Sequence, residues 1–464
     1  MKQGQIQQLK NLMQNLQQQD TTDLRDQIVS DIYARTEEIV TQTVMLPENK
    51  AQHEFDRRLD NVLTSRWLGY PIMMLMLGTV FYLTIAGANL PSSMLADFFF
   101  WIEGYLTTFF LWLGTPAWVH GVLVEGLYRG TAWVVSVMLP PMAIFFPAFA
   151  ILEDFGYLPR VAFNLDRFFK KAGAHGKQAL TMSMGFGCNA AGVIACRIIE
   201  SPRERTIAII TNNFVPCNGR FPTLITLATL FMGGAIGLAY GSLVATAVVV
   251  GLVLVGISVT LSVSWLLSKT MLRGIPSNFT LELPPYRKPQ FGRLLIRSVY
   301  DRTVFVLKRA VIVAAPAGIA TWILANIQVG DASILQHTAL FLDPFAQAIG
   351  LDGYILMAFI LGLPANEIVL PILIMSYLST GAMTEMSSLV ELKNLFLSNG
   401  WTWLTALCMM LFSLLHYPCG TTMWTIAKET KSTKWTLVAI LLPTSIALSV
   451  CFLVAQTVRF FGLV

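Results

Sequence analysis

Three cysteines of this chain follow a glycine or a proline inside an apolar stretch, and polar residues stand beside them. The candidate ligands at these positions and at a matching fourth position are Cys188, Asn189, Cys217, Asn366, Glu367 and Cys419. Thiolate, carboxylate and amide oxygen together suit a borderline divalent transition metal such as Fe(II), Mn(II) or Zn(II). Mg²⁺ and Ca²⁺ prefer shells of oxygen only. The residue types therefore predict a transition-metal site.

Glu367 is the only charged residue in the apolar segment 354–376. Burying a carboxylate inside a membrane is costly unless it has a function or a partner. A salt bridge to Arg220, the only base in segment 206–232, is the structural alternative. We interpret Glu367 as a carboxylate that offsets the charge of a bound ion.

A thiol enzyme is a second possibility, because His416 lies three residues before Cys419. A Cys–His nucleophile also needs an orienting third group and an oxyanion site, and neither occurs at a recognisable spacing. The remaining cysteines are interpreted as small packing residues: Cys196, Cys408 and Cys451. The chain is predicted not to be an enzyme.

The chain is 55% hydrophobic and only 13% charged, which is incompatible with a soluble domain of 464 residues. A helix needs about 20 apolar residues to cross roughly 30 Å of hydrocarbon. Stretches of that kind are 68–88, 131–151, 234–267, 303–327, 354–376, 401–415 with its continuation, and 435–461. They predict an all-α, polytopic membrane protein.

Lysine and arginine concentrate in cytoplasmic connections of membrane proteins. By this rule the N-terminus is cytoplasmic, because Arg57, Arg58 and Arg66 precede the first span. The other connections predicted inside are 153–177, 197–205 and 268–302. Those predicted outside are 89–130, 327–353 and 377–400. The apolar segments 178–196 and 354–376 each join two connections on one side, so both are predicted to be re-entrant hairpins.

The chain contains a repeat. Residues 185–189 at the first hairpin tip resemble residues 362–366 at the second, and residues 215–217 resemble residues 417–419 in the next span of each half. The predicted orientations of the two halves are opposite. Inverted repeats whose broken helices meet near the bilayer midplane are typical of secondary transporters.

This organisation divides the sequence into four predicted regions. They are a cytoplasmic N-terminal helical linker (1–66), a first membrane half with one candidate motif (67–267), a basic cytoplasmic loop (268–302) and a second membrane half (303–464). No G-x-x-x-x-G-K-[ST] motif occurs in them, so the chain is not expected to hydrolyse GTP by itself.

The motifs resemble a known family, the FeoB ferrous-iron transporters, over about residues 20–460. The first Gate segment of that family is similar to residues 152–160, 184–189, 201–205 and 213–220. The second is similar to residues 362–367 and 417–422, and the entry into the first span to residues 60–71.

The resemblance implies Fe²⁺ import across the inner or plasma membrane and implicates the Gate cysteines Cys188, Cys217 and Cys419. It implies no permanently bound cofactor. In that family a GTP-binding domain precedes the membrane part, so the resemblance implies control either by such a domain or by a separate GTP-binding protein on the cytoplasmic face. Lipid is a further partner, an oligomer is left open, and no nucleic acid is expected.

Alternatives remain at this point. Gate domains are similar in topology to concentrative nucleoside transporters, which segments 155–172 and 338–350 would fit as interfacial helices. A carrier of nucleosides or other small organic solutes is therefore the rival, as is a transporter of another divalent metal.

Overall fold

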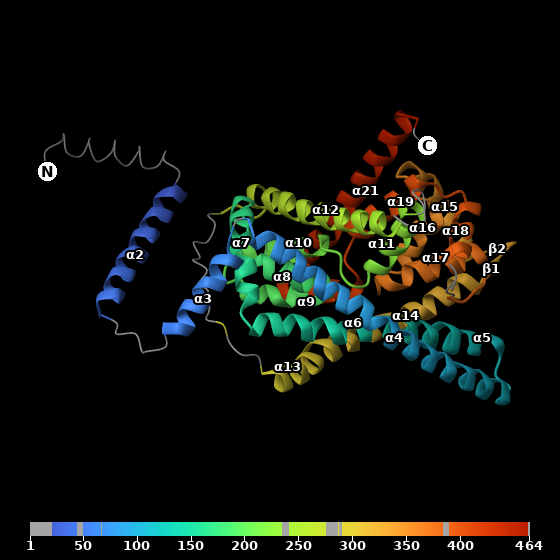
Figure 1. The fold of residues 1–464 in the computed structure, drawn as a ribbon. Coiled ribbons are helices and arrows are strands. Elements are labelled where there is room, and N and C mark those ends of the chain that lie inside the picture. Colours follow the sequence, from blue (N-terminus) through green and yellow to red (C-terminus); the bar gives the residue numbers. More distant parts are fainter. Residues whose placement is uncertain are drawn as a thin grey trace.

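The computed structural model describes residues 21–43, 50–65, 67–233, 241–274, 286, 290–383 and 389–462. These residues are almost entirely helical, apart from the short antiparallel pair β1 (Gln328–Val329) and β2 (Ala332–Ser333). Six helical stretches within them are long and apolar enough to cross a membrane: Leu90–Trp112, Ala117–Asp154, Val244–Lys269, Val306–Asn326, Trp403–Thr430 and Thr433–Phe460. The predicted all-α polytopic fold is confirmed (Figure 1).

The membrane part opens with a long helical hairpin. Helix α4 (Gly69–Trp112) has 44 residues, about 66 Å, and accommodates Pro91 in its interior. After a short turn, α5 (Ala117–His120), the π-helical η1 (Gly121–Tyr128) and α6 (Arg129–Asp154) return as one continuous stretch. Helices α4 and α6 pack side by side (Figure 1).

This hairpin corrects one expectation about the chain. We interpret 89–130 from sequence as a connection between spans, partly because of its acidic residues, yet most of it is helix, including the candidate span Leu90–Trp112. Glu103 is buried and accepts a 2.8 Å hydrogen bond from Nε of Arg129 on the returning helix. A charge that suggests a polar connection is therefore neutralised within the hairpin.

The first half continues with one helix and then the first predicted hairpin. Helix α7 (Tyr157–Lys171) precedes α8 (Gln178–Gly187) and α9 (Asn189–Ala195), which ends in the 3₁₀ turn η2 (Cys196–Ile198). Helices α8 and α9 pack on each other. Cys188 between them is extended, with φ −156° and ψ 126°, so the chain reverses where the sequence predicts a hairpin tip.

A broken span follows. Helix α10 (Pro202–Thr211) is capped by Ser201 and leads into the 3₁₀ turn η3 (Asn212–Phe214). The chain is then irregular until α11 (Phe221–Leu227), which continues into η4 (Ala228–Met232). Pro216 lies in the interruption and lacks the N–H that a continuous helix would use. Helix α12 (Gly241–Lys269) completes the half.

The second half repeats this order. It contains α13 (Phe291–Ser298), η6 (Val299–Val304), α14 (Phe305–Asn326), α15 (Ile334–Ala348), α16 (Gly353–Leu361), η7 (Asn366–Ile368), α17 (Val369–Leu378), α18 (Leu389–Ser398), α19 (Trp403–Leu415), α20 (Gly420–Thr430) and α21 (Thr433–Phe460). Helices α16 and α17 form the second hairpin, and α19 and α20 form the second broken span. Each half therefore contains, in the same order, a helix before the hairpin (α7 or α15), the hairpin, the broken span and a long helix.

The N-terminal segment contains α2 (Thr21–Thr43) and α3 (Lys50–Leu63). Arg160 on α7, whose side chain is 2% exposed, donates from Nε to Asp60 of α3 at 2.9 Å. Its guanidinium carbon lies 4.0 Å from the ring centre of Tyr286, whose hydroxyl donates to Asp60 at 2.6 Å. This buried contact joins the linker to the membrane part.

Several predictions stay predictions. Arg66 and part of the basic loop 268–302, namely residues 275–285 and 287–289, lie outside the described residues. The four regional boundaries and the cytoplasmic location of the N-terminus are likewise untested.

Candidate functional site

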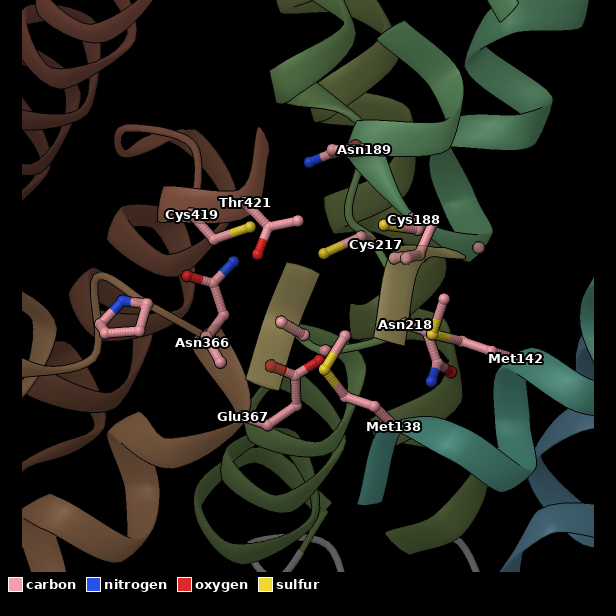
Figure 2. A pocket seen from close by; sticks show the side chains of 16 residues that line it. Met138, Met142, Cys188, Asn189, Cys217, Asn218, Asn366, Glu367, Cys419 and Thr421 are labelled. Carbon is pink, nitrogen blue, oxygen red and sulfur yellow. The ribbon is translucent and has the colours of Figure 1, made fainter. Parts of the chain in front are cut away.

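The tips of both hairpins and both helix breaks line one small cavity. All six candidate ligands predicted from sequence line it: Cys188, Asn189, Cys217, Asn366, Glu367 and Cys419. Figure 2 shows the sulfurs of Cys217 and Cys419 pointing toward each other, with Asn366 and Thr421 beside them. Residues more than 230 positions apart in the chain therefore share one site.

Ten further residues line the cavity that the sequence interpretation does not name as candidate ligands. These further lining residues are Met138, Met142, Gly187, Asn218, Gly219, Val306, Ala310, Pro364, Ala365 and Thr421. Met138 and Met142 come from α6 and place two thioethers at the cavity. The sequence interpretation misses them, although Pro140 and Pro141, which lie between these two methionines inside α6, are a signal that could have found them. Thr421 could have been predicted, because it lies only two residues after Cys419 in the same motif.

Helix N-termini surround the cavity. Cys188 is the N-cap of α9, Cys419 is the N-cap of α20, and Asn366 begins η7, which leads into α17. The N-terminal end of a helix carries partial positive charge and unpaired N–H groups. The helix breaks therefore place Cys188, Asn366 and Cys419 at the cavity, beside backbone ends whose partial charge is positive.

The two hairpin tips are attached to the two breaks in the same way. The N–H of Asn218, the residue after Cys217, donates to the carbonyl of Gly187 at 3.4 Å. The N–H of Gly420, the residue after Cys419, donates to the carbonyl of Leu363 at 2.7 Å. Each bond uses backbone groups that an unbroken helix would have satisfied internally. The two halves of the sequence repeat thus make equivalent hydrogen bonds between hairpin tip and helix break.

Arg220 joins the two helix breaks through hydrogen bonds to backbone carbonyls of both. It is fully buried and donates from Nη1 to the carbonyls of Asn213 and Leu414, each at 2.8 Å. Its Nη2 lies 3.4 Å from the carbonyl oxygen of His416, which also accepts from the amide of Asn213 at 2.6 Å. Because the carbonyls of Leu414 and His416 lie at the end of α19, the Arg220 guanidinium replaces the helical donors that the break removes.

Glu367 makes no ion pair with Arg220 in the part of the chain that the structure describes. Its half-buried carboxylate instead lies against the backbone of Gly219: a Cβ atom at Gly219 would be 2.0 Å from Oε1 of Glu367. Only glycine leaves room for the carboxylate at this point. The salt-bridge alternative is thus not what the structure shows.

Two other site residues have defined partners. One end of the Asn189 side-chain amide lies 3.2–3.3 Å from the carbonyl oxygens of Gly185, Asn212 and Val215, so we assign the nitrogen, the donor, to that end. The sulfur of Cys419 lies 3.2 Å from the hydroxyl of Thr422. Asn189 thus fixes the first hairpin tip.

The remaining histidine and cysteines stay out of the site. Nδ1 of His416 lies 3.0 Å from the carbonyl oxygens of Phe412 and Ser413, so this ring caps the end of α19. Among the described residues no hydrogen bond joins His416 to Cys419. Cys196 donates to Gly192 within its own hairpin, and Cys451 donates to the carbonyl of Cys408. None of these three cysteines lines the cavity.

The chain matches two family models. Residues 135–231 and 307–433 match the family described as "Gate: Nucleoside recognition", and residues 249–301 match "Ferrous iron transport protein B C terminus". No solved structure matches.

Curated relatives named "Fe(2+) transporter FeoB" include those of Staphylococcus aureus (strain MSSA476), 29% identical over 90% of this chain and 61% of the relative, and of Methanocaldococcus jannaschii, 27% identical over 89% and 58%. A Porphyromonas gingivalis relative, 25% identical over 86% of this chain and 51% of its own length, is named a fusion of Fe(2+) transport protein A and FeoB. The chain thus spans about three fifths or less of these relatives.

The two family matches together cover more than half of the chain. The Gate match includes both hairpins and both helix breaks, which line the cavity. The chain belongs to the FeoB family, whose Gate-containing membrane region it comprises.

Proposed function

We propose that this chain carries Fe(II) across the cell membrane through the cavity between the two hairpin tips. The observation that supports this most directly is the convergence of three thiols, three amides and one carboxylate from four separate helix breaks. A borderline divalent ion prefers such a mixed set of sulfur and oxygen donors. The names of the relatives support iron as the ion.

The donors would act in sequence on a hydrated cation. The carboxylate of Glu367 offsets part of the charge, and amide oxygens replace water. Cysteine sulfurs then supply soft ligands that favour Fe(II) over Mg²⁺ or Ca²⁺. In the described part of the chain no three of Cys188, Cys217, Cys419 and Glu367 lie close enough to bind one ion together, so the ion would meet them in turn. Because the site is built from half-helices of both repeats, a shift of one repeat against the other would open it to alternate sides.

The cavity favours a metal ion over a nucleoside. A nucleoside site needs aromatic and amide groups around the base and the sugar. None of the described residues that line the cavity is aromatic, and three carry thiols. The nucleoside alternative is therefore the weaker one.

The proposal includes control by a GTP-binding protein on the cytoplasmic face. The first contact for such a protein would be the linker helix α3, which the bonds of Asp60 to Arg160 attach to α7, the helix before the first hairpin. Movement of α3 would thus be transmitted toward Cys188.

Reconstitution in liposomes tests the proposal. The purified chain should conduct Fe(II) under reducing conditions, and the flux should respond to an added family GTPase together with GTP. Flux of uridine but not of Fe(II) would support the nucleoside alternative. Full Fe(II) flux that is indifferent to GTPase and GTP would retain iron transport and overturn the control by a GTP-binding partner.

A further inference from the structure

The cavity needs donors beyond its thiols and its carboxylate. Among the described residues, no three histidine, cysteine, aspartate or glutamate side chains lie close enough together to hold a metal ion by themselves. A divalent ion with fewer than four ligands is bound weakly, and oxygen donors of other residue types complete many sites. The missing ligands must therefore come from amides, hydroxyls or thioethers of the cavity wall.

One hydroxyl stands out among these groups. Eleven buried side-chain nitrogen and oxygen atoms in the described part of the chain lack a hydrogen-bond partner, and Oγ1 of Thr421 is the only one whose residue lines the cavity. Thr421 is 3% exposed. Figure 2 shows its oxygen directed into the space between Asn366 and the sulfurs of Cys217 and Cys419.

The position of Thr421 explains why its hydroxyl is unpaired. Threonine inside a helix usually donates to the carbonyl four residues earlier, as Thr425 does to Thr421 at 2.8 Å. Thr421 is the second residue of α20, so four residues earlier the chain is in the break. The neighbouring Thr422 lies 3.2 Å from the sulfur of Cys419. Leaving a buried hydroxyl unpaired is costly, about 1–3 kcal/mol, so this cost points to a ligand.

We propose that Oγ1 of Thr421 is an oxygen ligand of the transported ion, which rests on the proposed function. It would complement the thiolates with a harder donor next to Cys419. Such a mixed shell favours Fe(II) and Mn(II) over softer ions such as Cd(II), which gain most from sulfur. Thr421 is thereby a specificity-determining residue as well as a ligand.

The test is anaerobic metal binding by the full purified chain, with Fe(II) and with Cd(II). Thr421→Val keeps the β-branched shape and removes the hydroxyl, and Thr421→Ser keeps the hydroxyl. Thr321→Val is the matched control, because Thr321 on α14 is also buried with an unpaired hydroxyl but does not line the cavity.

We expect Thr421→Val to weaken Fe(II) binding at least tenfold and Cd(II) binding much less, whereas Thr421→Ser and Thr321→Val stay within about threefold of the unsubstituted chain. The thermal midpoint of Thr421→Val should not fall, because removing an unpaired buried hydroxyl is neutral or stabilising. Unchanged Fe(II) affinity in Thr421→Val overturns the ligand assignment alone. Absence of Fe(II) binding by the unsubstituted chain overturns the proposed function as well.

Discussion

The N–H of Gly420 donates to the carbonyl oxygen of Leu363 at 2.7 Å, which fastens the second hairpin tip to the second broken span. The first half has the equivalent bond from Asn218 to Gly187 at 3.4 Å. In each half the donor follows the cysteine of the break. Each bond therefore sets the position of a cysteine relative to a hairpin tip, which is the geometry that a shared ion site requires.

The three cavity thiols should be necessary for transport. Replacing Cys188, Cys217 and Cys419 together with serine keeps the volume but substitutes a harder, neutral donor, so Fe(II) flux in liposomes should fall at least tenfold. Cys451→Ser is the control, since Cys451 is also buried in a membrane helix but lies outside the cavity. Undiminished flux in the triple variant would rule out the cysteines as ligands.

Glu367→Gln should lower Fe(II) flux while the protein stays folded. The change keeps the shape of the side chain and removes the charge that offsets the ion. Glu125→Gln is a suitable comparison, because Glu125 accepts a hydrogen bond from Trp322 at 2.8 Å and does not line the cavity. Normal flux accompanied by a lower thermal midpoint would make Glu367 a structural residue instead.

Gly219→Ala should displace the Glu367 carboxylate, because the new Cβ would lie 2.0 Å from Oε1. Fe(II) affinity should fall in this variant. Gly251→Ala in α12 is matched to it, since a Cβ at Gly251 has no heavy atom within 4 Å, and alanine is the better helix former by about 1 kcal/mol. Equal Fe(II) affinity in both alanine variants would mean that Fe(II) binding does not depend on the position of the Glu367 carboxylate beside Gly219.

The contact between Asp60 and Arg160 should make stability depend on pH. Partial burial raises the pKa of Asp60, but the hydrogen bonds of Arg160 and Tyr286 and the charge of Arg160 outweigh this and hold the pKa below its usual value. The stabilisation is therefore complete above the unfolded pKa, about 3.9, and is lost as the pH falls through the folded one.

Asp60→Asn should accordingly cost about 1–3 kcal/mol at pH 7, and its difference from the unsubstituted chain should shrink below about pH 4. Thermal melts of detergent-solubilised protein between pH 7 and pH 3 measure this. Asp56→Asn, one turn earlier on α3, makes the same charge change as a control. A pH-independent difference would contradict the role given to the Asp60 carboxylate.

Much of this molecule follows from local properties of its sequence. Apolar stretches long enough for a membrane predict the helices, and glycine or proline at positions 185, 187, 216, 364 and 418 predicts where they break. Because the same interruptions occur in both halves, the sequence also predicts that Cys188, Cys217, Asn366 and Cys419 lie at equivalent places.

Tertiary structure decided what local pattern cannot encode. Most of residues 89–130 is helix, and the charges of Glu103 and Arg129, 26 positions apart, neutralise each other across the α4–α6 hairpin. Met138 enters the site only because α6 passes the hairpin tips, and Arg220 bonds carbonyls nearly 200 residues away rather than Glu367. Sequence thus determined where the helices end and which chemical groups stand at those ends, since both depend on neighbouring residues. Which groups face one another was decided by packing between distant segments, because burial and unpaired backbone carbonyls select partners through space.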